Sequence, residues 1–170
     1  KKIEESYLWL KVSNEIAKNN LIKEANKRGI NSSRLIFANY AEFNEHINRH
    51  SEGDLFLDTF NYNAHTTATE ALWAGLPVVT KMGKSFAARV AGSVINAIGL
   101  NELITESEEE YEALALELAT HPERLAQIKA NLEANRLTQP LFDTEQYTQH
   151  LETGYQMAYD RYFYGKEKQH

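Results

Sequence analysis

Residues 58–80 have the sequence DTFNYNAHTTATEALWAGLPVVT. An apolar strand ends at Asp58, a loop of small and polar residues follows, and a helix is predicted from near His65 to Ala74. Gly75 and Pro77 stop this helix, and residues 77–80 are predicted to form the next strand, with proline at its first position, where it is tolerated. A strand, a helix and a second strand in this order indicate one unit of a parallel sheet.

The same alternation extends in both directions along the chain. Further strands are predicted at Tyr7–Val12, Arg34–Ala38 and Asp54–Asp58, and further helices at about Ala17–Arg28, Glu42–His50 and Phe86–Ile98. Near-continuous apolar runs suit strands that are covered on both faces. Four alternations of strand and helix therefore predict an α/β fold, a Rossmann-like parallel sheet flanked by helices.

The last third of the chain changes character. Ser107 before three glutamates, and Pro122 after a histidine, predict two helix starts, and a long tyrosine-rich helix follows residues 140–144. We therefore expect one domain over residues 1–170, with 107–170 as a helical C-terminal portion. Only four strands are evident, whereas such sheets usually have five or six. We accordingly expect a domain truncated at its N-terminus, whose exposed backbone favours self-association.

Composition limits the classes of function. The 170 residues are 42% hydrophobic and 25% charged, which suits one packed domain. The net charge of −6 argues against a nucleic-acid binder. The absence of cysteine excludes disulfides, thiolate catalysis and cysteine zinc sites, and suits the cytoplasm. The sequence contains no run of about 18 apolar residues, so it does not predict a membrane-spanning helix.

The helix that begins near His65 carries the clearest candidate chemistry. The first N–H groups of a helix lack partners within the helix and attract anions, phosphate above all. His65, Thr66 and Thr67 add side-chain donors there, and Glu70, one turn further along, can accept from both hydroxyls of a ribose. A nucleoside diphosphate is thus expected at the carboxyl edge of the sheet. The simpler alternative is that Thr66 or Thr67 only caps the helix.

A longer motif decides between these alternatives. Asn63–Thr67, followed by Glu70–Thr80, closely resembles the donor-site motif of the O-linked N-acetylglucosamine transferases and their bacterial relatives. Other stretches match family landmarks in the family's order: 8–10, 34–37, 55–59, 85–91 and 140–144. The resemblance implies the C-terminal half of a GT-B glycosyltransferase, the half that holds a UDP-sugar.

The resemblance also implies roles for individual residues. His65, Thr66 and Thr67 match positions that hold the diphosphate and stabilise the leaving group, and Glu70 matches a ribose-binding acid that is often aspartate. Further upstream, the backbone of Ala41 is expected to bind uracil, His46 to pack near the base, and Arg49 to lie close by. Phe43 departs from the pattern, because some relatives carry a lysine there.

The implied reaction is inverting transfer of N-acetylglucosamine from UDP-GlcNAc to serine or threonine hydroxyls of proteins, without a metal or other cofactor. No residue is assigned as the base, and a lysine that meets the diphosphate in relatives precedes the matched region. The chain is therefore expected to be inactive alone, with the acceptor protein bound by other domains. The alternatives are the donor domain of a bacterial protein N-glucosyltransferase or of a fucosyltransferase, and a non-catalytic nucleotide-binding or interaction module.

Overall fold

The computed structural model describes residues 2–165. Residue 1 and residues 166–170, the end of the expected helical portion, lie outside the described residues. The chain begins with β1 (Leu8–Lys11), α1 (Glu15–Lys27), β2 (Leu35–Ala38) and α2 (Phe43–Arg49). It continues with β3 (Phe56–Leu57), α3 (Thr66–Trp73), β4 (Val78–Lys81), α4 (Val90–Ala97) and β5 (Ile104–Thr105). Three helices follow: α5 (Glu108–Thr120), α6 (Pro122–Asn135) and α7 (Thr144–Phe163).

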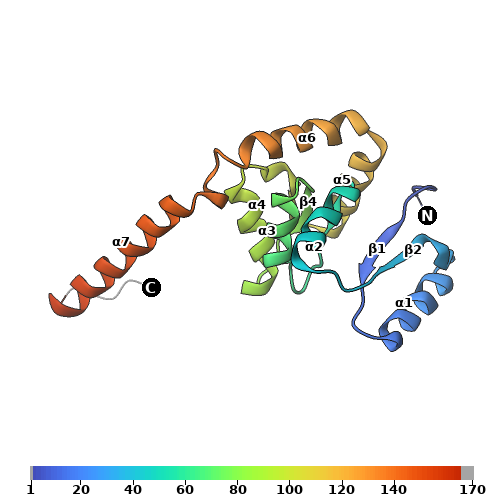
Figure 1. The fold of residues 1–170 in the computed structure, drawn as a ribbon, viewed down its shortest axis with the longest axis horizontal. Helices are drawn as coiled ribbons and strands as arrows, with labels where there is room; N and C mark the ends of the chain where they lie inside the picture. Colours follow the sequence, from blue (N-terminus) through green and yellow to red (C-terminus); the bar gives the residue numbers. More distant parts are fainter. Residues whose placement is uncertain (1, 166–170) are drawn as a thin grey trace.

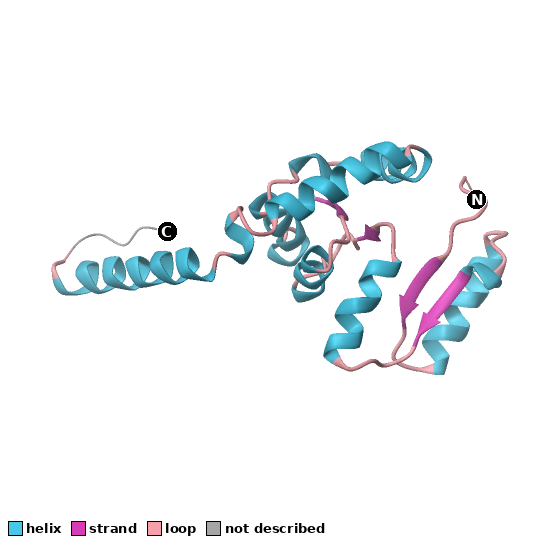
Figure 2. Ribbon diagram, turned by 45° about the horizontal axis from the view of Figure 1, so that its top comes forward, coloured by secondary structure: helices cyan, strands magenta, loops and turns pink. Residues whose placement is uncertain are grey.

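The strands are all paired in parallel, as expected, but they form two separate sheets. One joins β1 to β2, and the other has the order β3-β4-β5. Figure 2 shows the two groups of strands apart. A Rossmann sheet has the strand order 3-2-1-4-5-6. The sheet of β1 and β2 corresponds to 3-2 of that order, and the sheet of β3, β4 and β5 corresponds to 4-5-6. Among residues 2–165 no strand takes the central position 1, where it would pair with both β1 and β3.

The local signals placed most elements correctly. Gly29 and Gly75 end their helices with φ of 70° and 85°, a conformation that glycine adopts without steric cost. Ser107 and Glu110 form the reciprocal capping box that starts α5. The helix expected over residues 86–98 instead begins as a short 3-10 turn at Phe86–Ala88 and becomes α-helical only after Arg89.

The buried core lies around β4. Val78 and Val79 are fully buried, and α3, α4 and α5 pack against β4. Ile128 and Leu132 of α6 belong to the same core. The largest fully buried side chains include Leu72, Ile95, Ile98, Leu100, Leu103, Leu118 and Leu132. The core therefore holds α3 from one side, and this helix begins at the candidate site.

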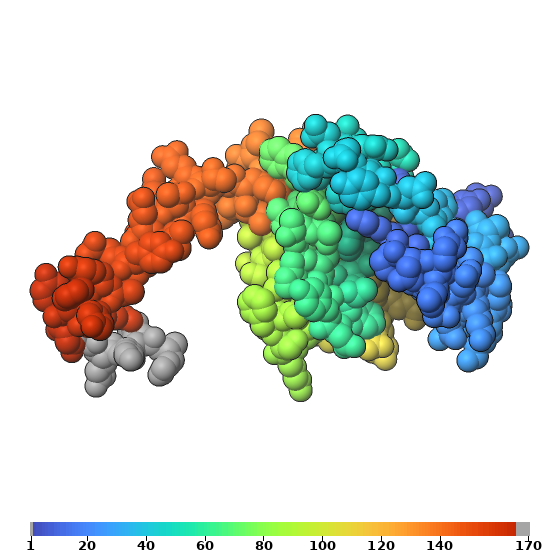
Figure 3. Space-filling model, turned by 60° about the horizontal axis from the view of Figure 1, so that its bottom comes forward, coloured from blue at the N-terminus to red at the C-terminus, as the bar shows by residue number. Residues whose placement is uncertain are grey.

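The two ends of the molecule are less enclosed. The β1–β2 pair and α1 lie at one end, and α7 extends from the other (Figure 1). In the space-filling view α7, orange to red, stands away from the body (Figure 3). No residue of α7 is buried, and its tyrosines are exposed.

Within residues 2–165 no helix is both long and apolar enough to cross a membrane.

Candidate nucleotide-sugar site

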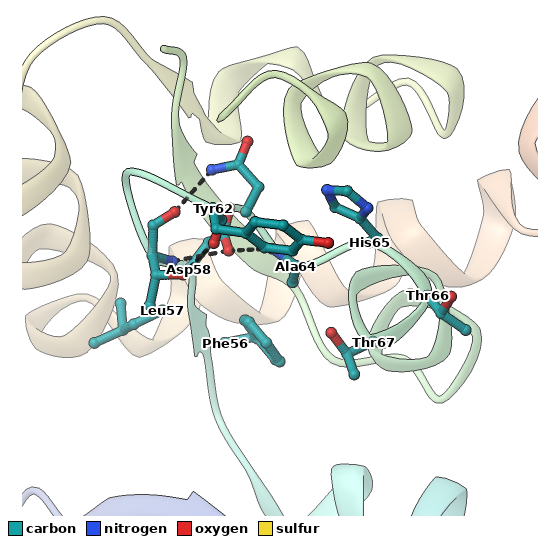
Figure 4. Close-up of a pocket in the computed structure, with 10 residues that line it drawn as sticks. Phe56, Leu57, Asp58, Tyr62, Ala64, His65, Thr66 and Thr67 are labelled. Carbon is teal, nitrogen blue, oxygen red and sulfur yellow. Dashed lines mark hydrogen bonds between the residues drawn. The ribbon is translucent and has the colours of Figure 1, made fainter. Parts of the chain in front are cut away.

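The candidate site is a cavity of about 440 Å³ at the carboxyl end of β3. This volume falls within the usual range of small-molecule sites. Its wall runs from β3 through the loop of residues 59–64 to the first turn of α3. The lining residues are Phe56, Leu57, Asp58, Thr59, Tyr62, Asn63, Ala64, His65, Thr66 and Thr67. Figure 4 shows His65, Thr66 and Thr67 on the side formed by the start of α3.

The start of α3 differs from the simple capping interpretation. The N-cap residue is His65, whose side chain makes no capping hydrogen bond, and Thr66 and Thr67 already lie inside the helix. Both threonines are exposed. The interpretation that Thr66 or Thr67 caps the helix is therefore wrong. No side chain caps the first turn of α3, and uncapped N–H groups at a helix start can bind an anion.

His65 is held by two aromatic rings. Its imidazole stacks on Tyr62, with ring centroids 4.8 Å apart and planes 14° apart, and it meets the edge of Phe86. Its Nε2 atom is buried and has no hydrogen-bond partner among residues 2–165. A buried polar atom without a partner is costly, so this nitrogen is available to a ligand or water.

A second cluster joins α2 to α3 beside the cavity. His46 Nε2 lies 3.2 Å from Glu70 Oε2, and Arg49 Nη2 lies 2.6 Å from His46 Nδ1. Arg49 also donates to the carbonyl of Asn39, in the loop that contains Ala41. His50 meets the edge of the His46 ring, and burial is the main cause that lowers the pKa of His50.

The structure thus divides the predicted residues into two groups. His65, Thr66 and Thr67 line the cavity, whereas His46, Arg49 and Glu70 contact one another, and Ala41 lies in the loop before α2. Glu70 lies four residues after Thr66 on α3, so the two share a helix face. Helix α3 therefore carries Glu70 of the second group as well as the two threonines of the first.

Asp58 is a prominent residue of the cavity wall that was not predicted from the sequence. Asp58 is only 4% exposed, and its carboxylate accepts hydrogen bonds from Thr59, Ala64 and Thr80. Burial is the main cause that raises the pKa of Asp58, although these hydrogen bonds oppose the rise. The sequence shows an acid directly after an apolar strand, but it does not show the hydrogen-bond partners that define its role.

Lys81 has a structural role. Its ammonium group lies 3.2 Å from Glu108 and 4.4 Å from the centre of the Phe60 ring. These two contacts occupy the Lys81 ammonium group within the protein. Among residues 2–165, no group of three His, Asp or Glu side chains is placed to hold a metal ion.

With this geometry established, similarity to known proteins identifies the family. The sequence profile of glycosyl transferase family 41 matches residues 1–151. The chain belongs to glycosyl transferase family 41. The expected α/β, Rossmann-like class is confirmed by a solved structure, an O-GlcNAc transferase mutant from Thermobaculum terrenum. It matches with a TM-score of 0.82 and 30% identity, over 88% of this chain and 29% of that chain.

Two transferases are also similar in sequence to this chain. A probable UDP-N-acetylglucosamine–peptide N-acetylglucosaminyltransferase from Arabidopsis thaliana is 37% identical over 171 residues, which cover all of this chain and 18% of that protein. The corresponding transferase of Caenorhabditis elegans is 34% identical over 168 residues, 99% of this chain and 15% of that protein. The chain therefore spans less than a fifth of the length of these relatives.

Proposed function

We propose that this chain is the UDP-sugar-binding domain of an inverting glycosyltransferase that transfers N-acetylglucosamine from UDP-GlcNAc to serine or threonine hydroxyls of proteins. The observation that carries the proposal is the start of α3, which opens on the 440 Å³ cavity without a side-chain cap. Membership of family 41 and the names of the relatives support the same activity.

The diphosphate would lie at this helix start. The N-terminus of a helix carries a partial positive charge, and its free N–H groups bind phosphate oxygens. The hydroxyls of Thr66 and Thr67 and the ring of His65 add donors around the same position. During transfer, the bond from the anomeric carbon to the β-phosphate oxygen breaks, and its electron pair stays on UDP. These groups would stabilise the charge that develops there.

The nucleoside would lie toward α2. We assign the ribose hydroxyls to Glu70, uracil to the backbone of Ala41, and the neighbourhood of the base to His46 and Arg49. Glu70 Oε2 faces His46, which leaves Oε1 as the oxygen assigned to the ribose. The two groups of residues, which are joined through Thr66 and Glu70 on α3, would then hold the two halves of the same UDP molecule.

The remainder of the reaction is assigned outside this set of residues. The acceptor hydroxyl attacks the anomeric carbon from the face opposite UDP, and its proton passes to a base for which no residue of this chain is assigned. We accordingly propose that the chain is inactive alone, that acceptor proteins bind elsewhere in the enzyme, and that the enzyme acts in the cytoplasm. No metal or other cofactor is proposed, because α3 and its side chains would offset the charge of the leaving group.

The test is calorimetric titration of UDP into the chain and, in parallel, into the complete gene product. Replacing both Thr66 and Thr67 with alanine is expected to weaken binding at least tenfold, on the order of 1.4 kcal/mol. The matched control replaces Thr148 and Thr153, two exposed threonines of α7 that only bond helix carbonyls, and should leave binding unchanged.

The outcomes separate the alternatives. Binding only by the complete gene product would mean that residues outside this chain complete the site, whereas no binding by either would refute the proposal and favour a non-catalytic module. A competition series with UDP-GlcNAc, UDP-glucose and GDP-fucose then identifies the donor. Preference for either of the last two would replace N-acetylglucosamine transfer with glucosyl or fucosyl transfer.

A further inference from the structure

The carboxylate of Asp58 closes the loop of residues 59–64 at both of its ends. Its Oδ1 atom accepts from the N–H of Thr59 at 2.8 Å and from the N–H of Ala64 at 2.7 Å. Its Oδ2 atom accepts from the hydroxyl of Thr80 at 2.6 Å. The side chain therefore joins the beginning of the loop, the end of the loop and the neighbouring strand β4. Figure 4 shows Asp58 beside the loop.

Asp58 is itself fixed by the body of the domain. The hydroxyl of Tyr111, on α5, donates to the backbone carbonyl of Asp58 at 3.0 Å. The hydroxyl of Thr105, on β5, donates to the carbonyl of Thr80 at 3.0 Å. Hydrogen bonds thus connect β3, β4, β5 and α5 around one buried acid, which gives the loop a rigid reference point.

The loop leads directly to the candidate phosphate site. Ala64, whose N–H is held by Asp58, immediately precedes His65, the N-cap of α3. The loop is tied down further by Asn63, whose N–H donates to the carbonyl of Ala87 and whose side chain donates to the carbonyl of Thr59. The position of Ala64 therefore determines where the first turn of α3 faces the cavity.

The chemistry of Asp58 argues against a direct contact with a diphosphate. A carboxylate beside an anionic ligand would oppose its binding, and both oxygens of Asp58 already accept hydrogen bonds from the protein. Burying an acid is costly, as the raised pKa of Asp58 reflects. What Asp58 provides in return is a fixed loop, because one carboxylate accepts hydrogen bonds from three donors at once.

We propose that Asp58 is a positioning residue, which holds the loop of residues 59–64 so that the start of α3 faces the diphosphate of the donor. This inference rests on the proposed function, and it adds a residue that does not touch the donor.

The experiment compares Asp58→Ala with Asp58→Asn in the complete gene product. Asparagine Oδ1 can still accept from both N–H groups, and the Thr80 hydroxyl can rotate to accept from its amide. Asp58→Ala should weaken UDP binding at least tenfold, which corresponds to about 1.4 kcal/mol. The affinity of Asp58→Asn for UDP should stay within about threefold of the wild type. Hydrogen exchange over residues 59–64, measured without nucleotide, should accelerate in the alanine variant only.

A matched control separates positioning from a general loss of stability. Leu132→Ala removes a fully buried side chain of α6 that lies outside the loop and the cavity wall. It should lower the stability of the fold while leaving UDP affinity and loop exchange at wild-type values. If Leu132→Ala weakens UDP binding as much as Asp58→Ala does, the role of Asp58 is only structural and the inference fails.

The remaining outcomes distinguish the inference from the proposed function. If the wild type binds UDP and Asp58→Ala binds equally well, the inference is overturned while the donor site stands. If the wild type binds no UDP, the proposed function fails and the inference fails with it, even where loop exchange responds to Asp58→Ala.

Discussion

His46 Nε2 lies 3.2 Å from Glu70 Oε2, and this contact joins α2 to α3. On its other side, His46 Nδ1 lies 2.6 Å from Arg49 Nη2. Because a guanidinium group only donates hydrogen bonds, Nδ1 must accept, and Nε2 carries the proton that faces Glu70. His46, which we assign to the neighbourhood of uracil, thus orients Glu70, which we assign to the ribose.

The first prediction is that His46 and Glu70 are energetically coupled. His46→Ala removes the donor that orients the Glu70 carboxylate, so a further Glu70→Ala change should cost less than it does in the wild type. The coupling in a double-mutant cycle on UDP affinity should be about 0.5–3 kcal/mol, the usual range for residues in contact. Calorimetric titration of the wild type, both single variants and the double variant measures it.

A second cycle serves as the control. Glu133 is an exposed acid on α6, and we expect His46→Ala and Glu133→Ala to be additive within about 0.5 kcal/mol. Additivity in the His46–Glu70 cycle as well would show that the two side chains bind UDP independently.

The second prediction concerns pH and Asp58. Burial raises the pKa of Asp58 above its ordinary value, so between that value and the folded-state pKa the folded protein binds more protons than the unfolded chain. The contribution of Asp58 to stability is therefore fully present at low pH and is lost as pH rises through the folded-state pKa. Asp58→Asn cannot titrate, so the wild type should lose stability relative to this variant over that range.

Urea unfolding at a series of pH values measures this difference. The free energy of unfolding of the wild type, minus that of Asp58→Asn, should fall with rising pH and then become constant. A difference that increases with pH would mean that the hydrogen bonds from Thr59, Ala64 and Thr80 outweigh desolvation and lower the pKa.

The third prediction tests how the core supports α3. Leu72 is 0% exposed and lies on the buried face of this helix, together with Ala68 and Ala71. Leu72→Ala should destabilise the fold by about 2–5 kcal/mol, because a buried cavity is left behind. Leu137→Ala, at an 81% exposed position, should change stability by no more than about 0.5 kcal/mol. Equal effects in urea unfolding would contradict the assignment of α3 to the core.

Sequence patterns predicted the parts of the fold that depend on local chemistry. Gly75, Pro77 and the Ser107 capping box mark element ends through backbone preferences that neighbouring residues determine. The fifth strand, Ile104–Thr105, was missed because it has a single apolar residue, whereas β3 lies within the apolar run of residues 55–57. The four predicted strands also gave no sign that the structure would contain two separate sheets, since strand pairing depends on distant parts of the chain.

The candidate site shows the same division. Three residues chosen from the motif, His65, Thr66 and Thr67, line the cavity, because neighbours at a helix start stay together in space. The role of Asp58 could not be predicted, since its partners Ala64, Thr80 and Tyr111 lie 6, 22 and 53 residues away. The contact between His46 and Glu70, 24 residues apart, likewise requires α2 to pack on α3.

The last prediction concerns the open edge of β1. Among residues 2–165, β1 pairs only with β2, and Leu8 and Trp9 are 45% and 38% exposed. An unpaired strand edge with apolar side chains is a template for pairing with another chain, and a charge on that edge opposes such pairing. We therefore expect the chain of residues 1–170 to self-associate, and Leu8→Lys to reduce the association.

Size-exclusion chromatography with light scattering measures this over a range of concentrations. The wild-type mass should rise above the 19.5 kDa of one chain as concentration increases, and Leu8→Lys should shift that rise to higher concentration. Leu137→Lys places the same charge at an exposed position outside the strands and should have no effect. Tyr155→Lys tests the exposed tyrosines of α7, so if it alone restores the monomer, association runs through that helix and not through the edge of β1.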